Sequence, residues 1–109
     1  MEPKKIYLAI PYNDSKDGIR WERFKKANEV AAALMRRGHC VFSPISHSHP
    51  IAEQCDLPKG YDFWRSWNKP FVEWCDELHV VTIDGWKEST GVQDEIRMAE
   101  EMGKKVVLI

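Results

Sequence analysis

Residues that can do chemistry gather in the last quarter of the chain, where Ser89 and Gly91 precede an acid, Glu95. Helical spacing places Glu95 three residues after Val92, on the same apolar stripe as Ala99. A carboxylate beside a buried stripe is costly unless it has a partner or a function. Two interpretations stay open: Glu95 interacts with the helix N-terminus, where the macrodipole favours negative charge, or it serves the function of the protein.

This predicted helix begins with Ser89, Thr90 and Gly91, where a strand's loop meets the helix start. Their hydroxyl and backbone N–H groups can cap the helix, which is the commoner use of such residues. The same groups can hold a phosphate, because a helix N-terminus is an anion site. The spacing of a P-loop is absent. Asp94 and Glu101 fall off the apolar stripe and are expected to face solvent.

His47 and His49, in the segment SHSHP, are the next candidates. Two loop histidines without a nearby acid or cysteine at ligand spacing are more often surface residues than metal ligands, so no metal site is predicted. Arg20, at the end of a loop, can reach an anion. The three cysteines form no CxxC pair, and the default compartment is a reducing cytoplasm.

The composition favours one soluble globular domain over residues 1–109, with 43% hydrophobic and 30% charged residues. A net charge of −1 indicates neither a nucleic-acid polymer nor an anionic membrane as partner. No apolar run is long enough to span a bilayer.

Strand and helix patterns alternate along the chain, which predicts a parallel sheet covered on both faces. The predicted strands span residues 4–10, 39–44, 77–83 and 104–109. The predicted helices span 19–37, 61–75 and 89–102, and residues 45–60, which contain "SHSHP", are expected to form a loop with at most one helical turn.

Ligands of such folds bind beyond the carboxyl ends of the strands. Three loops follow the predicted strands there, at residues 11–18, 43–50 and 84–91, and they hold most of the turn-forming residues. They contribute the candidate binding residues Pro11, Tyr12, His47, Gly85 and Trp86. The aromatic residues between 61 and 75 are expected mainly in the core or in an interface, with one or two available to stack on a base.

Together these motifs resemble the nucleoside 2-deoxyribosyltransferase-like superfamily, which includes the 2′-deoxynucleoside 5′-phosphate N-hydrolases. The resemblance covers nearly the whole chain, from "IYLAIPY" through "RRGHCVFSP" to the final 35 residues. It is strongest in the Ser-x-Gly turn, the Glu four residues later and the Gly-Lys before the last strand, which are here Ser89, Gly91, Glu95 and Gly103-Lys104. The Gly85-Trp86 pair is similar to members whose function is unassigned.

The resemblance implies a mechanism. The residue matched by Glu95 would be the nucleophile that attacks the anomeric carbon of deoxyribose, as in a retaining glycosidase, and Tyr7 would orient it by a hydrogen bond. Ser89 would hold a 5′-phosphate or 5′-hydroxyl. No metal or cofactor is implied, and a homo-oligomer is expected.

One departure concerns Asn68, which stands where the superfamily usually has an Asp that protonates the departing base or contacts the sugar. An amide cannot act as a general acid. Either Asp62 or another group substitutes, or the chain is catalytically weak, or it binds without reacting. A second departure is Arg97, which stands where a Gly is common.

The sequence therefore predicts an α/β domain, a flavodoxin-like three-layer sandwich with a four- or five-stranded parallel sheet. The predicted function is hydrolysis or transfer at the N-glycosidic bond of a nucleoside or nucleotide, with Glu95, Tyr7 and Asn68 as the catalytic set. A non-catalytic nucleotide-sensing module on the same fold is the alternative. An interaction protein that binds no nucleotide is a third possibility.

Overall fold

The computed structural model describes residues 2–13, 17–58 and 60–109. Residues 14–16 and 59, which belong to two of the predicted loops, lie outside the described residues. A four-stranded parallel sheet forms the middle layer, in the order β2-β1-β3-β4. The strands are β1 (Lys5–Ala9), β2 (Cys40–Phe42), β3 (Glu77–Val80) and β4 (Lys105–Leu108). The predicted flavodoxin-like α/β fold is confirmed.

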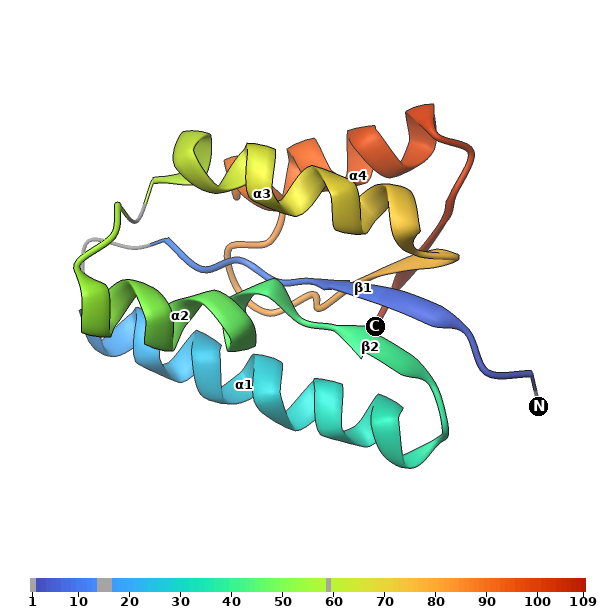
Figure 1. Ribbon diagram of the computed structural model, residues 1–109, viewed down its shortest axis with the longest axis horizontal. Helices are drawn as coiled ribbons and strands as arrows, with labels where there is room; N and C mark the ends of the chain where they lie inside the picture. Colours follow the sequence, from blue (N-terminus) through green and yellow to red (C-terminus); the bar gives the residue numbers. More distant parts are fainter. Residues whose placement is uncertain (1, 14–16, 59) are drawn as a thin grey trace.

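Helices cover both faces of the sheet (Figure 1). They are α1 (Asp17–Arg36), α2 (Pro44–Cys55), α3 (Tyr61–Trp74) and α4 (Thr90–Glu101). In Figure 1, α1 and α2 lie side by side below the sheet and α3 and α4 lie above it. Three of these helices agree with the predicted ranges to within two residues at each end.

The prediction of a loop over residues 45–60 is wrong for its first part, which forms α2. Pro44 occupies the first turn of this helix, where its missing N–H costs nothing. Pro50 lies inside the helix and removes one backbone hydrogen bond. Packing of α2 against α1, with Ala52 buried, outweighs that loss.

Side chains alternate across the sheet and so build two cores. Ile6 and Leu8 of β1 pack with residues of α1 below the sheet. Tyr7 and Ala9 point the other way, into a core with Leu78 of β3 and with residues of α3 and α4. This alternation aims the Tyr7 side chain at α4.

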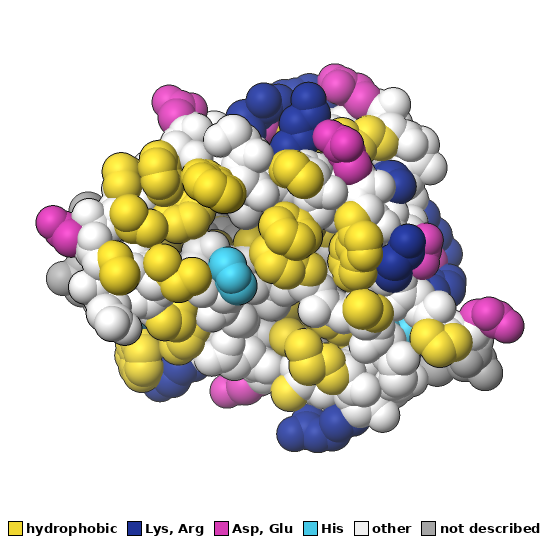
Figure 2. Space-filling view, in the orientation of Figure 1, with side chains coloured by type: hydrophobic (Ala, Val, Ile, Leu, Met, Phe, Trp, Pro, Cys, Tyr) yellow, Lys and Arg dark blue, Asp and Glu magenta, His cyan; other side chains and the backbone are white. Residues whose placement is uncertain are grey.

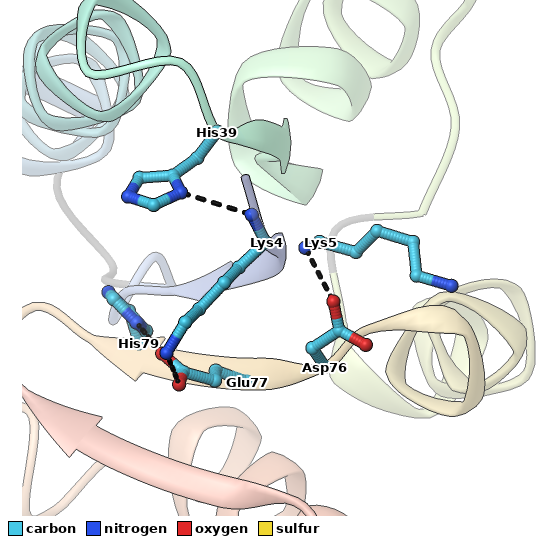
Figure 3. Close-up of polar contacts among 6 residues, drawn as sticks. All are labelled: Lys4, Lys5, His39, Asp76, Glu77 and His79. Carbon is cyan, nitrogen blue, oxygen red and sulfur yellow. Dashed lines mark hydrogen bonds and ion pairs between the residues drawn. The ribbon is translucent and has the colours of Figure 1, made fainter. Parts of the chain in front are cut away.

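A polar cluster ties the strands together at their amino ends (Figure 3). The Lys4 ammonium lies 2.7 Å from one oxygen of Glu77, and His79 Nε2 lies 2.9 Å from the other. The hydrogen bonds of Glu77 to His79 and Lys4 lower its pKa to about 2. Lys5 N donates to Asp76 Oδ2 over 2.9 Å in the same region. These contacts lie at the opposite end of the strands from the loops that were expected to bind a ligand.

Hydrophobic side chains also gather on the surface over α2 and α3 (Figure 2). Ile51, Trp67 and Phe71 are the exposed large hydrophobic residues of these two helices. None of the helices among residues 2–13, 17–58 and 60–109 is long and apolar enough to cross a bilayer.

Candidate active site

A cavity of about 270 Å³ lies beyond the carboxyl ends of the strands. The chain leaves β1 towards β2 and leaves β3 towards β4, so the strand order reverses between the neighbours β1 and β3. A parallel sheet opens a crevice at such a reversal. Four segments line the cavity. They are Ile10, Tyr12 and Asn13 after β1, one side of α2, one side of α3, and residues 88–92 together with Glu95 at the start of α4.

Glu95 and Tyr7 form a buried pair at this cavity. Glu95 lines it but is only 5% exposed, and the Tyr7 hydroxyl donates a hydrogen bond to its carboxylate. Burial raises the pKa of Glu95 to about 8; the Tyr7 hydrogen bond lowers it, and the charge of Asp94 raises it. Burial and the Glu95 charge also raise the pKa of Tyr7 well above its usual range. Tyr7 therefore stays a hydrogen-bond donor to Glu95.

Asp94 was expected to face solvent, and this prediction is wrong: it is 5% exposed. Its carboxylate accepts hydrogen bonds from Tyr61 Oη (2.9 Å), Arg65 Nε (2.6 Å) and Arg97. Burial acts to raise the pKa of Asp94, but these hydrogen bonds outweigh it and hold the pKa below its usual range. The apolar side of α4 faces the sheet, and Asp94 lies on the neighbouring side of the helix, which α3 covers. Arg97, at the position where a Gly is common, supports Asp94 and does not line the cavity.

The cavity-lining side of α3 carries Tyr61, Trp64 and Asn68, at helical spacing. The ring of Tyr61 lies against Gly91 of α4, where an added Cβ would come within 3.0 Å of it. Gly91 thus makes room for the Tyr61 ring, whose hydroxyl is held by Asp94. Asp62, considered as a substitute acid, is exposed and does not line the cavity.

Ser89 lines the cavity and also caps α4. Its hydroxyl accepts a hydrogen bond from the Val92 N–H at 3.2 Å. The first backbone N–H groups of a helix have no acceptor within the helix. Thr90 and Gly91 carry such groups, so this end of the cavity suits an anion.

Tyr12 and His49 line the cavity on the side of α2. The Tyr12 hydroxyl is hydrogen-bonded to His49 Nδ1, and the His49 ring stacks on Phe24 with centroids 4.5 Å apart. The sequence favoured a surface or hydrogen-bonding role for His49 over a metal site and did not place it among the binding residues, because the helix that turns it to the cavity was not predicted. Within the described part of the chain, no group of three or more acid, His or Cys side chains gathers as a metal site would.

Five candidate binding residues do not line the cavity. His47 is exposed beside Phe42, at the edge strand β2. Arg20 lies in the first turns of α1, where its charge acts on Tyr12. The other three are Pro11, which is buried, Gly85, which has a positive φ of 92°, and Trp86, which packs against the core of α3 and α4.

Comparisons with known proteins agree with this architecture. The family described as "Domain of unknown function (DUF1937)" matches residues 4–109. A solved structure of the 2-deoxyribosyltransferase from Bacillus psychrosaccharolyticus is similar with a TM-score of 0.67 and 27% identity, over 95% of this chain and 70% of that chain. No protein with a curated description matches the chain. The chain therefore belongs to the DUF1937 family and has the fold of a nucleoside deoxyribosyltransferase.

Proposed function

We propose that this protein cleaves or transfers at the N-glycosidic bond of a deoxynucleoside or its 5′-monophosphate, with Glu95 as nucleophile. The observation that carries the proposal is the buried Glu95, which lines the cavity and accepts a hydrogen bond from Tyr7. A buried carboxylate beside a single neutral donor is a reactive group once it is deprotonated. The similarity to a 2-deoxyribosyltransferase supports the same reading.

The reaction proceeds in two steps. A Glu95 oxygen bonds to C1′ of the sugar while the C1′–N bond breaks, and the electron pair leaves with the base, which takes a proton from water. The oxygen of a second water molecule then bonds to C1′ and the ester to Glu95 breaks, which restores the carboxylate and releases a proton. A second base in place of this water gives transfer instead of hydrolysis. Two displacements at C1′ retain its configuration.

The start of α4 binds the 5′ end of the substrate in this proposal. Ser89 and the N–H groups of Thr90 and Gly91 line the cavity at the positive end of the helix dipole. A 5′-phosphate bound there would place the sugar within reach of Glu95, one turn further along the same helix.

A nucleoside-binding module without catalysis is the second candidate, and Asn68 is the observation that favours it. Asn68 lines the cavity where an acid would help the base to leave, and an amide has no acidic proton. This candidate predicts binding without release of free base.

The experiment is a chromatographic assay for free base with a panel of deoxynucleosides and their 5′-monophosphates. Wild type is compared with Glu95→Ala, Asn68→Asp and a matched control, Glu101→Ala, which changes an exposed acid on the same helix. Release by the wild type and the control, and none by Glu95→Ala, is expected. Binding with no release from the wild type or Asn68→Asp would favour the second candidate instead.

A further inference from the structure

Asn68 is a buried polar side chain that turns to the cavity and not to the protein. It is 7% exposed and lines the cavity. Its amide has no hydrogen-bond partner among the residues that the structure describes. The Asn68 amide atoms are not among the fully buried side-chain atoms that lack a partner in the described residues, so they reach the open space of the cavity. An amide in this setting is available to a ligand.

The other polar groups on the same side of α3 are already in use. The Tyr61 hydroxyl donates to Asp94, and the Trp64 indole N–H donates to the Pro58 carbonyl oxygen over 2.7 Å. Both residues therefore present rings to the cavity. Aromatic rings beside an amide that is open to the cavity suit a planar heterocycle. Such a ligand stacks on a ring and forms hydrogen bonds with the amide along its edge.

The departure of the base from the sugar indicates which edge of the base the Asn68 amide would contact. An amide offers one N–H donor and one carbonyl acceptor in a single plane. In a purine, N7 shares the five-membered ring with N9, the nitrogen that departs from the sugar. A donor to N7 therefore stabilises the electron pair that leaves with the base. Asn68 can supply that hydrogen bond although it cannot supply a proton.

We infer that Asn68 selects a 6-aminopurine deoxynucleoside by donating to N7 and accepting from the 6-amino group. Adenine presents this acceptor and donor side by side, which is the pattern that an Asn side chain matches with two hydrogen bonds. Hypoxanthine and guanine present a carbonyl oxygen at position 6, which would face the amide oxygen. This inference rests on the proposed function, since it takes the cavity to be the nucleoside site.

The test measures binding by calorimetry to Glu95→Gln, which binds without turnover. The probes are 2′-deoxyadenosine, 2′-deoxyinosine, in which the 6-amino group is replaced by oxygen, and 7-deaza-2′-deoxyadenosine, which lacks N7. We expect 2′-deoxyadenosine to bind about tenfold more tightly than either of the others. Adding Asn68→Leu, which has similar volume, should bring all three to similar affinities; Asn68→Asp should also lose the preference, because a carboxylate cannot donate to N7.

The outcomes separate this inference from the proposed function. Equal binding of the three nucleosides in the presence of Asn68, or a preference that survives Asn68→Leu and Asn68→Asp, would overturn the base assignment while the glycosidic chemistry stands. Binding of none of them, together with no release of base by the wild type, would overturn the proposed function and this inference with it. Circular dichroism of each variant confirms that it is folded.

Discussion

The hydroxyl of Tyr7, in the middle of β1, donates a hydrogen bond to the carboxylate of Glu95, in the second turn of α4. The two residues are 88 positions apart in the sequence. Neither has other hydrogen-bonding partners among the described side chains, and both are buried. The pair links the centre of the sheet to the wall of the cavity. Substitutions at either residue test how the hydrogen bond and burial set the pKa of Glu95.

Tyr7→Phe should reduce activity and shift its pH dependence upwards. The Tyr7 hydrogen bond favours the charged form of Glu95, so its loss raises the pKa of Glu95 beyond about 8. At neutral pH we expect kcat/KM for base release to fall by about tenfold or more. The measurement is kcat/KM against pH for both proteins. Partial recovery at alkaline pH is the internal control, and an unshifted profile would show that Tyr7 does not act on Glu95.

Glu95→Gln should stabilise the protein at pH 8 and leave its stability unchanged near pH 4. Because the folded-state pKa of Glu95 is raised from 4.5 to about 8, the folded protein keeps a proton that the unfolded chain releases in this interval. Stability is therefore lost as pH rises from 4.5 to about 8. Glutamine avoids this loss and can still accept from Tyr7, for a gain of about 1–3 kcal/mol at pH 8. Urea unfolding at pH 4 and pH 8 measures this gain in the free energy of unfolding, with Glu101→Gln as control. An equal gain at the two pH values would contradict the raised pKa of Glu95.

Asp94→Ala should destabilise the protein by about 1–3 kcal/mol, because it removes the acceptor that joins α3 to α4. Arg65 and Arg97 are partly exposed and can turn to water, which limits the loss. The matched control, Glu101→Ala, changes an exposed acid on the same helix and should stay within about 0.5 kcal/mol of wild type. Chemical denaturation compares the two variants. Similar small effects from both would mean that Asp94 does not hold the helices together.

Glu77→Gln should weaken the protein at neutral pH but not in acid. Its folded-state pKa is lowered from 4.5 to about 2 by His79 and Lys4 (Figure 3). That stabilisation is present above pH 4.5 and is lost as pH falls towards 2. A loss of about 1–3 kcal/mol is expected at pH 7, shrinking to nothing near pH 2. Thermal unfolding against pH tests this, with the exposed Glu73→Gln as control; a constant difference would rule out the linkage.

The fold could be predicted largely from local patterns. Short apolar runs identified the four strands, and the 3.6-residue period identified three of the helices. The prediction failed at α2, because the prolines between residues 44 and 58 indicated a loop. Pro44 fits the first turn of the helix, and packing on α1 compensates for Pro50 in its interior. That packing also turns His49 to the cavity and leaves His47 outside it.

The sequence by itself determined that Glu95 faces inward, because the spacing of Val92, Glu95 and Ala99 belongs to a single helix and needs no knowledge of its neighbours. It also determined the alternation that aims Tyr7 at one face of the sheet. Only the tertiary structure decided that Asp94 is buried under α3 and that the Asn68 side chain lines the cavity. The spacing of apolar residues predicts which side of a helix packs on the sheet. The contacts on its other sides are made by segments far away in the chain, which local spacing does not indicate.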